Sequence, residues 1–133
     1  MIIAQITDLH LGFEGEGRVC HNTRRLHLVI EELNNMVAKP DLILATGDLV
    51  ESGERWAYEK LRDALAELKY PIHFAMGNHD NRDVFGDVFP DAEFNDGFLQ
   101  YTLEDGPVRV IVLDTLKNGF HGGDFCERRQ DWL

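Results

Sequence analysis

Cysteine, long apolar runs and positive charge are all scarce in this chain of 133 residues. The two cysteines, Cys20 and Cys126, lie far apart and form no C-x-x-C pair, so the sequence indicates neither a disulfide framework nor a zinc ribbon. The longest apolar runs, such as 42–45 and 110–113, are too short to cross a bilayer, and we expect no membrane segment. Residues 1–6 lack the basic segment and cleavage site of a signal peptide, so we interpret them as a strand of a cytoplasmic protein.

Basic residues are outnumbered: 13 Lys and Arg stand against 24 Asp and Glu, and the formal net charge is −11. A surface of this sign repels a polyphosphate backbone, so we expect no nucleic acid polymer as a partner. A small phosphate ester stays compatible if a bound metal ion supplies local positive charge. With 44% hydrophobic and 28% charged residues, the chain is otherwise typical of one globular domain spanning 1–133.

Three short apolar runs, at 2–6, 42–45 and 72–76, predict strands. Apolar residues at helical spacing between the first two runs predict a helix over 23–38 with Asn22 as its N-cap. The apolar positions of that helix are Leu26, Val29, Ile30, Leu33 and Val37. A second amphipathic segment separates the second and third runs. This alternation is typical of right-handed βαβ crossovers, and it predicts a parallel sheet with helices on its face.

The pattern changes after the third run. Residues 84–89 predict a short helix, and two strands at 98–103 and 108–113 flank an Asp-Gly pair typical of a hairpin turn. A glycine-rich loop over 118–124 is followed by the start of a helix at 127–133. Because a helix of about two turns buries little apolar surface, we expect the C-terminal part of the domain to be missing from this chain.

Polar residues follow each of the first three predicted strands, at the edge where the carboxyl ends of parallel strands meet. The three segments are Asp8-Leu9-His10, Gly47-Asp48 and Gly77-Asn78-His79-Asp80. Carboxylate, imidazole and amide oxygen suit a divalent ion that takes part in hydrolysis, and the absence of thiolate argues against a purely structural zinc site. We therefore expect a metal site at this edge, with Asp80 supporting the backbone of the third segment.

In this order, each at a strand end, the three segments resemble the first three motifs of the calcineurin-like metallophosphoesterases. Within that superfamily the chain is most similar to bacterial class III cyclic nucleotide phosphodiesterases and related glycerophosphodiesterases, over residues 2–133. The resemblance includes Asp41-Leu42, which leads into Gly47-Asp48, and Gln130-x-Trp132-Leu133 near the end. It implies an α/β fold, a β-sandwich flanked by helices, of which this chain holds the N-terminal half.

The resemblance also implies a role for each motif residue. Asp8 and His10 bind one divalent ion, Asp48 bridges two ions, and Asn78 binds the second. His79 binds no metal and acts as a catalytic residue on the leaving group. Two ions, of Mn, Fe, Zn or Co, hold a hydroxide that attacks the phosphorus of a small phosphodiester, either a cyclic nucleotide or a glycerophosphodiester.

Two features depart from the family pattern. Glu51 stands where family members often carry an aspartate that orients the catalytic histidine, and we expect Glu51 to take that catalytic role. The further histidines that complete the family's site have no match after Asp114, so the first metal has three ligands here and the second has two. This shortage agrees with a missing C-terminal portion.

The residues also leave other interpretations open. Asp8 or Asp48 alone could be a loop or helix-capping carboxylate. Arg82 could contact a phosphate or form a surface ion pair, Asp114 is expected to be a turn or capping residue, and His121 could line the substrate cleft. The alternatives to a phosphodiesterase are a nuclease of the same superfamily and a non-catalytic scaffold. A homodimer is compatible with the resemblance.

Overall fold

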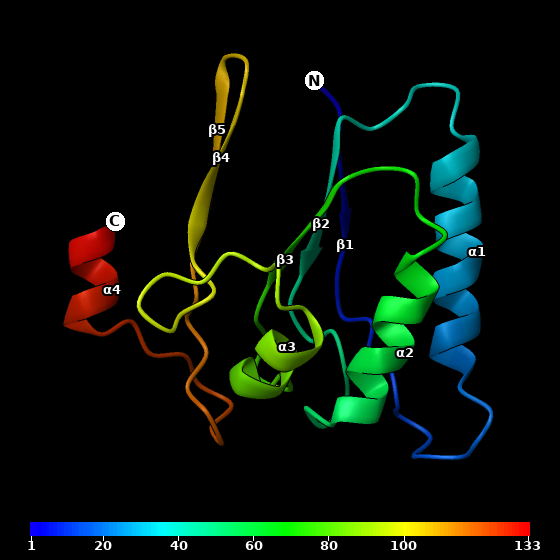
Figure 1. Cartoon of the computed structure of the whole chain (residues 1–133), viewed down its shortest axis with the longest axis horizontal. Coiled ribbons are helices and arrows are strands. Elements are labelled where there is room, and N and C mark those ends of the chain that lie inside the picture. The colour runs from blue at the N-terminus through cyan, green and yellow to red at the C-terminus, as the bar shows by residue number, and fades with distance from the viewer.

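The computed structural model describes residues 1–133, which form five strands and four helices (Figure 1). In chain order these are β1 (Ile3–Ile6), α1 (His21–Asn35), β2 (Leu42–Thr46), α2 (Arg55–Leu65), β3 (Ile72–Ala75), α3 (Arg82–Val88), β4 (Tyr101–Asp105), β5 (Val108–Val112) and α4 (Glu127–Trp132). The alternation of strands and helices as far as α3 confirms the expected α/β class. No helix combines the length and the apolar character that crossing a membrane requires.

The sheet formed by β1, β2 and β3 is parallel throughout, as predicted. β2 is the central strand, and its Ala45 lies opposite Ile6 on one side and opposite Phe74 on the other. Contact between the chain segments continues beyond β1, where the Asp8 N–H donates to the Gly47 carbonyl at 3.2 Å. Because the three strands run in the same direction, the loops that follow them meet at one edge of the sheet.

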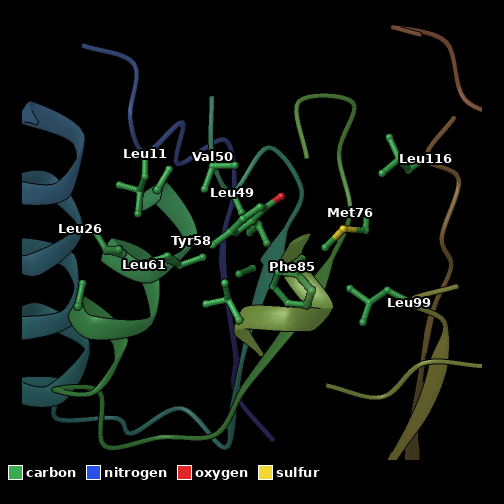
Figure 2. Packing of buried hydrophobic residues seen from close by; sticks show 14 of the residues in the cluster. Leu11, Leu26, Leu49, Val50, Tyr58, Leu61, Met76, Phe85, Leu99 and Leu116 are labelled. Atoms are coloured by element: carbon green, nitrogen blue, oxygen red, sulfur yellow. The ribbon is translucent and has the colours of Figure 1, made fainter. Parts of the chain in front are cut away.

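One hydrophobic core joins the first three helices to this sheet. Figure 1 shows α1 and α2 side by side along one side of the sheet, with α3 near β3. Figure 2 shows Leu26, Tyr58 and Phe85, one from each helix, within the same cluster of buried side chains, and each is at most 2% exposed. Burial of a leucine or phenylalanine side chain contributes roughly 1.5–3 kcal/mol. The core therefore fixes the strands that carry the polar loops.

The first helix differs from its prediction at both ends. It begins at His21, before the expected start, and it ends at Asn35, before the expected end. The N-cap is Cys20 and not the expected Asn22, which lies within the helix and donates from its side chain to the His10 carbonyl at 3.0 Å. Of the expected apolar positions, Leu26, Ile30 and Leu33 are buried, whereas Val29 is 38% and Val37 102% exposed. The helix thus buries fewer side chains than its pattern of apolar residues predicts.

The expected β-hairpin is present but begins later in the chain. β4 and β5 pair antiparallel, with Tyr101 opposite Val112. The segment before Tyr101 is not part of the strand, because the Leu99 N–H donates to the Asp114 carboxylate at 2.9 Å instead of to a neighbouring strand. Tyr101 attaches the hairpin to the parallel sheet, since its hydroxyl donates to the Phe74 carbonyl and accepts from the Phe74 N–H.

A buried ion pair joins α3 to the chain after β5. Asp114 is fully buried, and the Arg82 guanidinium donates to its two carboxylate oxygens at 2.6 and 2.7 Å. Arg129 of α4 donates to the Asp114 carbonyl at 2.9 Å. Asp114 also makes a turn contact with the Leu116 N–H, but its chief partner is Arg82. The expectations of a phosphate contact or a surface ion pair for Arg82 are therefore wrong.

Candidate metal centre

Left-handed backbone conformations shape the loops that carry the expected ligands. Asp8, His10 and Asp48 have φ angles of 54°, 44° and 47°. A non-glycine residue in this region costs about 1 kcal/mol or more, and aspartate and histidine tolerate it better than most residues. Hydrogen bonds between the loops hold these conformations, among them one from the His10 N–H to the Asp48 carbonyl at 2.9 Å. The same conformations place the three side chains together.

Asp8, His10 and Asp48 form one cluster whose ligand atoms all lie within 4.8 Å of one another. The His10 Nε2 atom lies 3.8 Å from a carboxylate oxygen of Asp48. The Thr7 hydroxyl donates to Asp8 at 2.6 Å and holds that carboxylate at the edge of the site. Two carboxylates and an imidazole in one cluster fit a divalent ion that takes oxygen and nitrogen ligands, such as Mn, Fe, Zn or Co.

The close approach of the third loop to Asp48 depends on Gly77. A Cβ atom on Gly77 would lie 2.2 Å from the Asp48 Oδ1 atom and 2.3 Å from its backbone nitrogen, so no other residue fits there without displacement. Two residues further on, the His79 N–H donates to Asp48 Oδ1 at 3.0 Å. The glycine thus allows the backbone of the third loop to fix the orientation of the Asp48 carboxylate.

Glu51 contacts both histidines of the site, through different groups. Its carboxylate lies 2.8 Å from Nδ1 of His10, whereas its backbone carbonyl lies 2.8 Å from Nδ1 of His79. The carboxylate is further from His79, at 3.9 Å. The hydrogen bond to the Glu51 carbonyl raises the pKa of His79, and the negative charges of Asp48 and Glu51 act in the same direction. The two imidazole rings meet edge to face, with centroids 4.8 Å apart.

Asn78 lies beside the loop that follows β5. Its Nδ2 atom lies 3.3 Å from Nδ1 of His121. Both residues line two neighbouring cavities of about 340 and 190 Å³, and the larger one also contains Glu51 and His79 in its wall. None of the residues lining the larger cavity is hydrophobic. The structure therefore places a polar space beside Asn78, one of the expected ligands, and beside the expected catalytic histidine.

Asp80 contributes to the wall of the larger cavity but is only 6% exposed, and its carboxylate is engaged by groups of the surrounding loops and α2. It accepts hydrogen bonds from the N–H groups of Leu49, Val50 and Gly77, and from the Tyr58 hydroxyl at 3.0 Å. Burial raises the pKa of its carboxyl group. Asp80 therefore ties the second loop to the third, as expected of a residue that supports the backbone of the motif.

Two contributors to the site have no signal in the sequence. Tyr58 occupies an apolar position of α2, yet its hydroxyl reaches Asp80 and also accepts from the Asn81 N–H at 2.8 Å. Asn22 lies on α1 and holds the His10 carbonyl. Neither has a partner at a recognisable spacing, because both contacts arise only when helices pack against the loops.

The fold and the arrangement of the polar loops agree with a comparison against protein families. The chain belongs to the calcineurin-like phosphoesterase family, whose model matches residues 1–131. This result confirms the resemblance seen in the three motifs.

Individual relatives include enzymes that act on phosphodiesters. The chain is 30% identical to a protein of Arcobacter nitrofigilis described as a probable glycerophosphodiester phosphodiesterase, over 100% of this chain and 50% of that protein. It is 33% identical to a cAMP/cGMP dual specificity phosphodiesterase of Mycobacterium tuberculosis, over 99% of this chain and 43% of the relative. It is 29% identical to a cyclic adenosine monophosphate phosphodiesterase of Escherichia coli, over 98% and 48%. The chain thus spans about half the length of these relatives.

Proposed function

We propose that this protein is a metal-dependent phosphodiesterase that hydrolyses a small phosphodiester. The observation that carries the proposal is the cluster of Asp8, His10 and Asp48, whose ligand atoms lie within 4.8 Å of one another at the strand ends. Family membership and the phosphodiesterases among the relatives support the same class of reaction.

In this proposal Asp8, His10 and Asp48 hold one divalent ion, and Asp48 and Asn78 hold a second. Such a pair of ions supplies Lewis acidity for the phosphate oxygens and lowers the pKa of water, so that hydroxide is available near neutral pH. The chain itself supplies orientation: the His79 N–H fixes one oxygen of Asp48, and the backbone of the first two loops is locked by hydrogen bonds.

His79 is the proposed proton donor to the leaving group. A carbonyl oxygen only accepts hydrogen bonds, so the contact with the Glu51 carbonyl requires a proton on Nδ1 of His79. Proton transfer to a leaving oxygen therefore takes place at Nε2. The side chain also lines the larger cavity, where a substrate has access to it.

The proposed substrate is a cyclic nucleotide or a glycerophosphodiester. A wall without hydrophobic residues suits a small polar ester, and the net charge of −11 disfavours a nucleic acid polymer. The relatives include proteins named as phosphodiesterases of each substrate type, which supports this choice. Assays with both substrates decide between them.

The test combines metal binding with hydrolysis. The chain is titrated with Mn²⁺, and release of product from cAMP, glycerophosphocholine and a nitrophenyl diester is measured for the wild type, Asp48→Asn and His79→Ala. We expect Asp48→Asn to lose metal binding and activity together. We expect His79→Ala to keep metal binding and to lower kcat by roughly 10²- to 10⁴-fold, the usual contribution of a general acid. Asp63→Asn, at an exposed helix residue, and His27→Ala, at a half-exposed one, serve as matched controls.

The alternatives give different outcomes in the same assays. A non-catalytic scaffold shows no hydrolysis, and Asp48→Asn leaves its behaviour unchanged. A nuclease cleaves single-stranded DNA in the presence of Mn²⁺ faster than it cleaves cAMP. Either outcome would overturn the proposal.

A homodimer is a further part of the proposal, based on the family resemblance alone. Light scattering of the purified chain distinguishes a dimer from a monomer of 15.2 kDa. The cytoplasmic location expected from the sequence stays a prediction.

A further inference from the structure

His121 contacts Asn78, one of the proposed metal ligands. It lies in the chain between β5 and α4, and its Nδ1 atom is 3.3 Å from the Asn78 Nδ2 atom. Its ring centroid is 6.4 Å from that of His79. His121 lines both cavities next to Asn78. A loop far along the sequence thus places one imidazole against two residues of the third motif.

The base of this loop is fixed, so the contact is not that of a free segment. The Asp124 N–H donates to the Thr115 carbonyl at 2.9 Å and closes the loop. The Asp124 carboxylate accepts from Arg129 at 2.7 Å, and Arg129 also donates to the carbonyl of the fully buried Asp114. The loop is therefore attached, through Arg129, to the buried Arg82–Asp114 ion pair that connects α3 to the chain after β5.

The chemistry of the two side chains fixes the direction of the hydrogen bond between them. The amide nitrogen of Asn78 can only donate, so Nδ1 of His121 accepts and the ring carries its proton on Nε2. With Nδ2 engaged in this way, the amide oxygen of Asn78 stays available on the other side of the amide group. This matters because divalent ions bind the oxygen of an amide and not its NH₂ group.

We propose that His121 is a positioning residue that holds the Asn78 amide in the orientation that presents its oxygen to a divalent ion. This inference rests on the proposed function, in which Asn78 binds the second ion. Without an acceptor at His121, the amide is free to rotate by a half turn and to present its NH₂ group instead. Partners of this kind typically change metal affinity 10- to 100-fold.

The test measures binding of Mn²⁺ to the full 133-residue chain, with the wild type compared with His121→Ala and His121→Gln. We expect His121→Ala to weaken binding at the Asn78 site roughly 10- to 100-fold and to leave the Asp8 and His10 site unchanged. His121→Gln retains an acceptor oxygen, and we expect it to restore most of the affinity. The side chain of His121 is exposed, so neither variant disturbs the core. The matched control is His27→Ala, which replaces a half-exposed histidine of α1.

A double-mutant cycle separates positioning from direct ligation. If His121 acts through Asn78, adding His121→Ala to Asn78→Ala causes no further loss of Mn²⁺ affinity. A further loss in the double variant would show that His121 itself binds the ion. Equal losses in His121→Ala and His121→Gln would show that an acceptor at this position does not support Mn²⁺ affinity. Either result would overturn the inference.

The outcome also distinguishes this inference from the proposed function. A wild-type chain that binds Mn²⁺ and hydrolyses a diester, together with an unchanged His121→Ala variant, would overturn the inference alone. A wild-type chain that binds no Mn²⁺ would overturn both.

Discussion

Replacing Glu51 by alanine separates two ways in which this residue can support the reaction. The carboxylate contacts His10, whereas the backbone carbonyl contacts His79. The substitution removes the first contact and keeps the second. The backbone stays in place, because the Glu51 N–H donates to the Leu11 carbonyl at 2.9 Å. The variant therefore tests the carboxylate alone.

The magnitude follows from the geometry of the His10 contact. A carboxylate that accepts from the far nitrogen of a metal-binding imidazole fixes the orientation of the ring and raises its basicity, and its loss usually costs 10- to 100-fold in affinity. The side chains of His10 and Glu51 are 26% and 27% exposed, so water replaces part of the lost contact. We expect Glu51→Ala to weaken Mn²⁺ binding by about 10-fold, or about 1.4 kcal/mol.

The assay compares Mn²⁺ affinity with kcat at saturating Mn²⁺. We expect affinity to fall and kcat to stay within a few-fold of the wild type, because His79 keeps its carbonyl acceptor. Glu51→Gln retains an acceptor oxygen and should lose less affinity than Glu51→Ala. Glu32→Ala, which changes an exposed residue of α1, is the matched control.

The opposite result would refute this reasoning. A large loss of kcat with unchanged Mn²⁺ affinity would mean that the carboxylate orients His79, as the family pattern predicts, despite its 3.9 Å distance in the structure.

Three further variants or measurements test the framework of the site. Gly77→Ala places a methyl group 2.2 Å from the Asp48 carboxylate, so it should weaken Mn²⁺ binding at least 10-fold. Asp80→Asn replaces an acceptor of several N–H groups by a mixed donor and acceptor, and urea denaturation should show a loss of about 1–3 kcal/mol. Burial raises the pKa of Tyr101 to about 12, whereas the tyrosine of an unfolded chain ionises near pH 10. The free energy of unfolding should therefore fall as the pH rises from about 10 to about 12. Tyrosinate absorbance at about pH 11 should be lower in the folded chain than in urea.

Much of the frame could be predicted from local patterns. The three apolar runs, with helical spacing between them, are sufficient to predict the parallel sheet. Parallel strands need long crossover connections, and such connections are right-handed. The polar residues after each run then had to lie at one edge. The proximity of Asp8, His10 and Asp48 follows from this topology and needs no information on side-chain packing.

Contacts between distant segments could not be predicted in the same way. Arg82 and Asp114 are 32 residues apart, and neither sits in a pattern that indicates its partner. The start of α1 could not be predicted from its capping pattern, because the helix begins at His21 and Asn22 donates to the His10 carbonyl instead of capping the helix. Glu51 was assigned to His79 by analogy, and the split between its carboxylate and its carbonyl depends on a loop conformation that residue types do not encode.

The contact of Tyr58 with Asp80 connects the loops that carry the proposed metal ligands to the hydrophobic core. Tyr58 is fully buried in α2, and through Asp80 it reaches the N–H groups of Leu49, Val50 and Gly77. Binding loops commonly open by themselves at a small cost in free energy. We expect these amide protons to exchange with solvent only when the core itself opens, so that their exchange rates report global unfolding. We therefore expect the loops to be ordered in the absence of an ion, so that ion binding costs little free energy for ordering them.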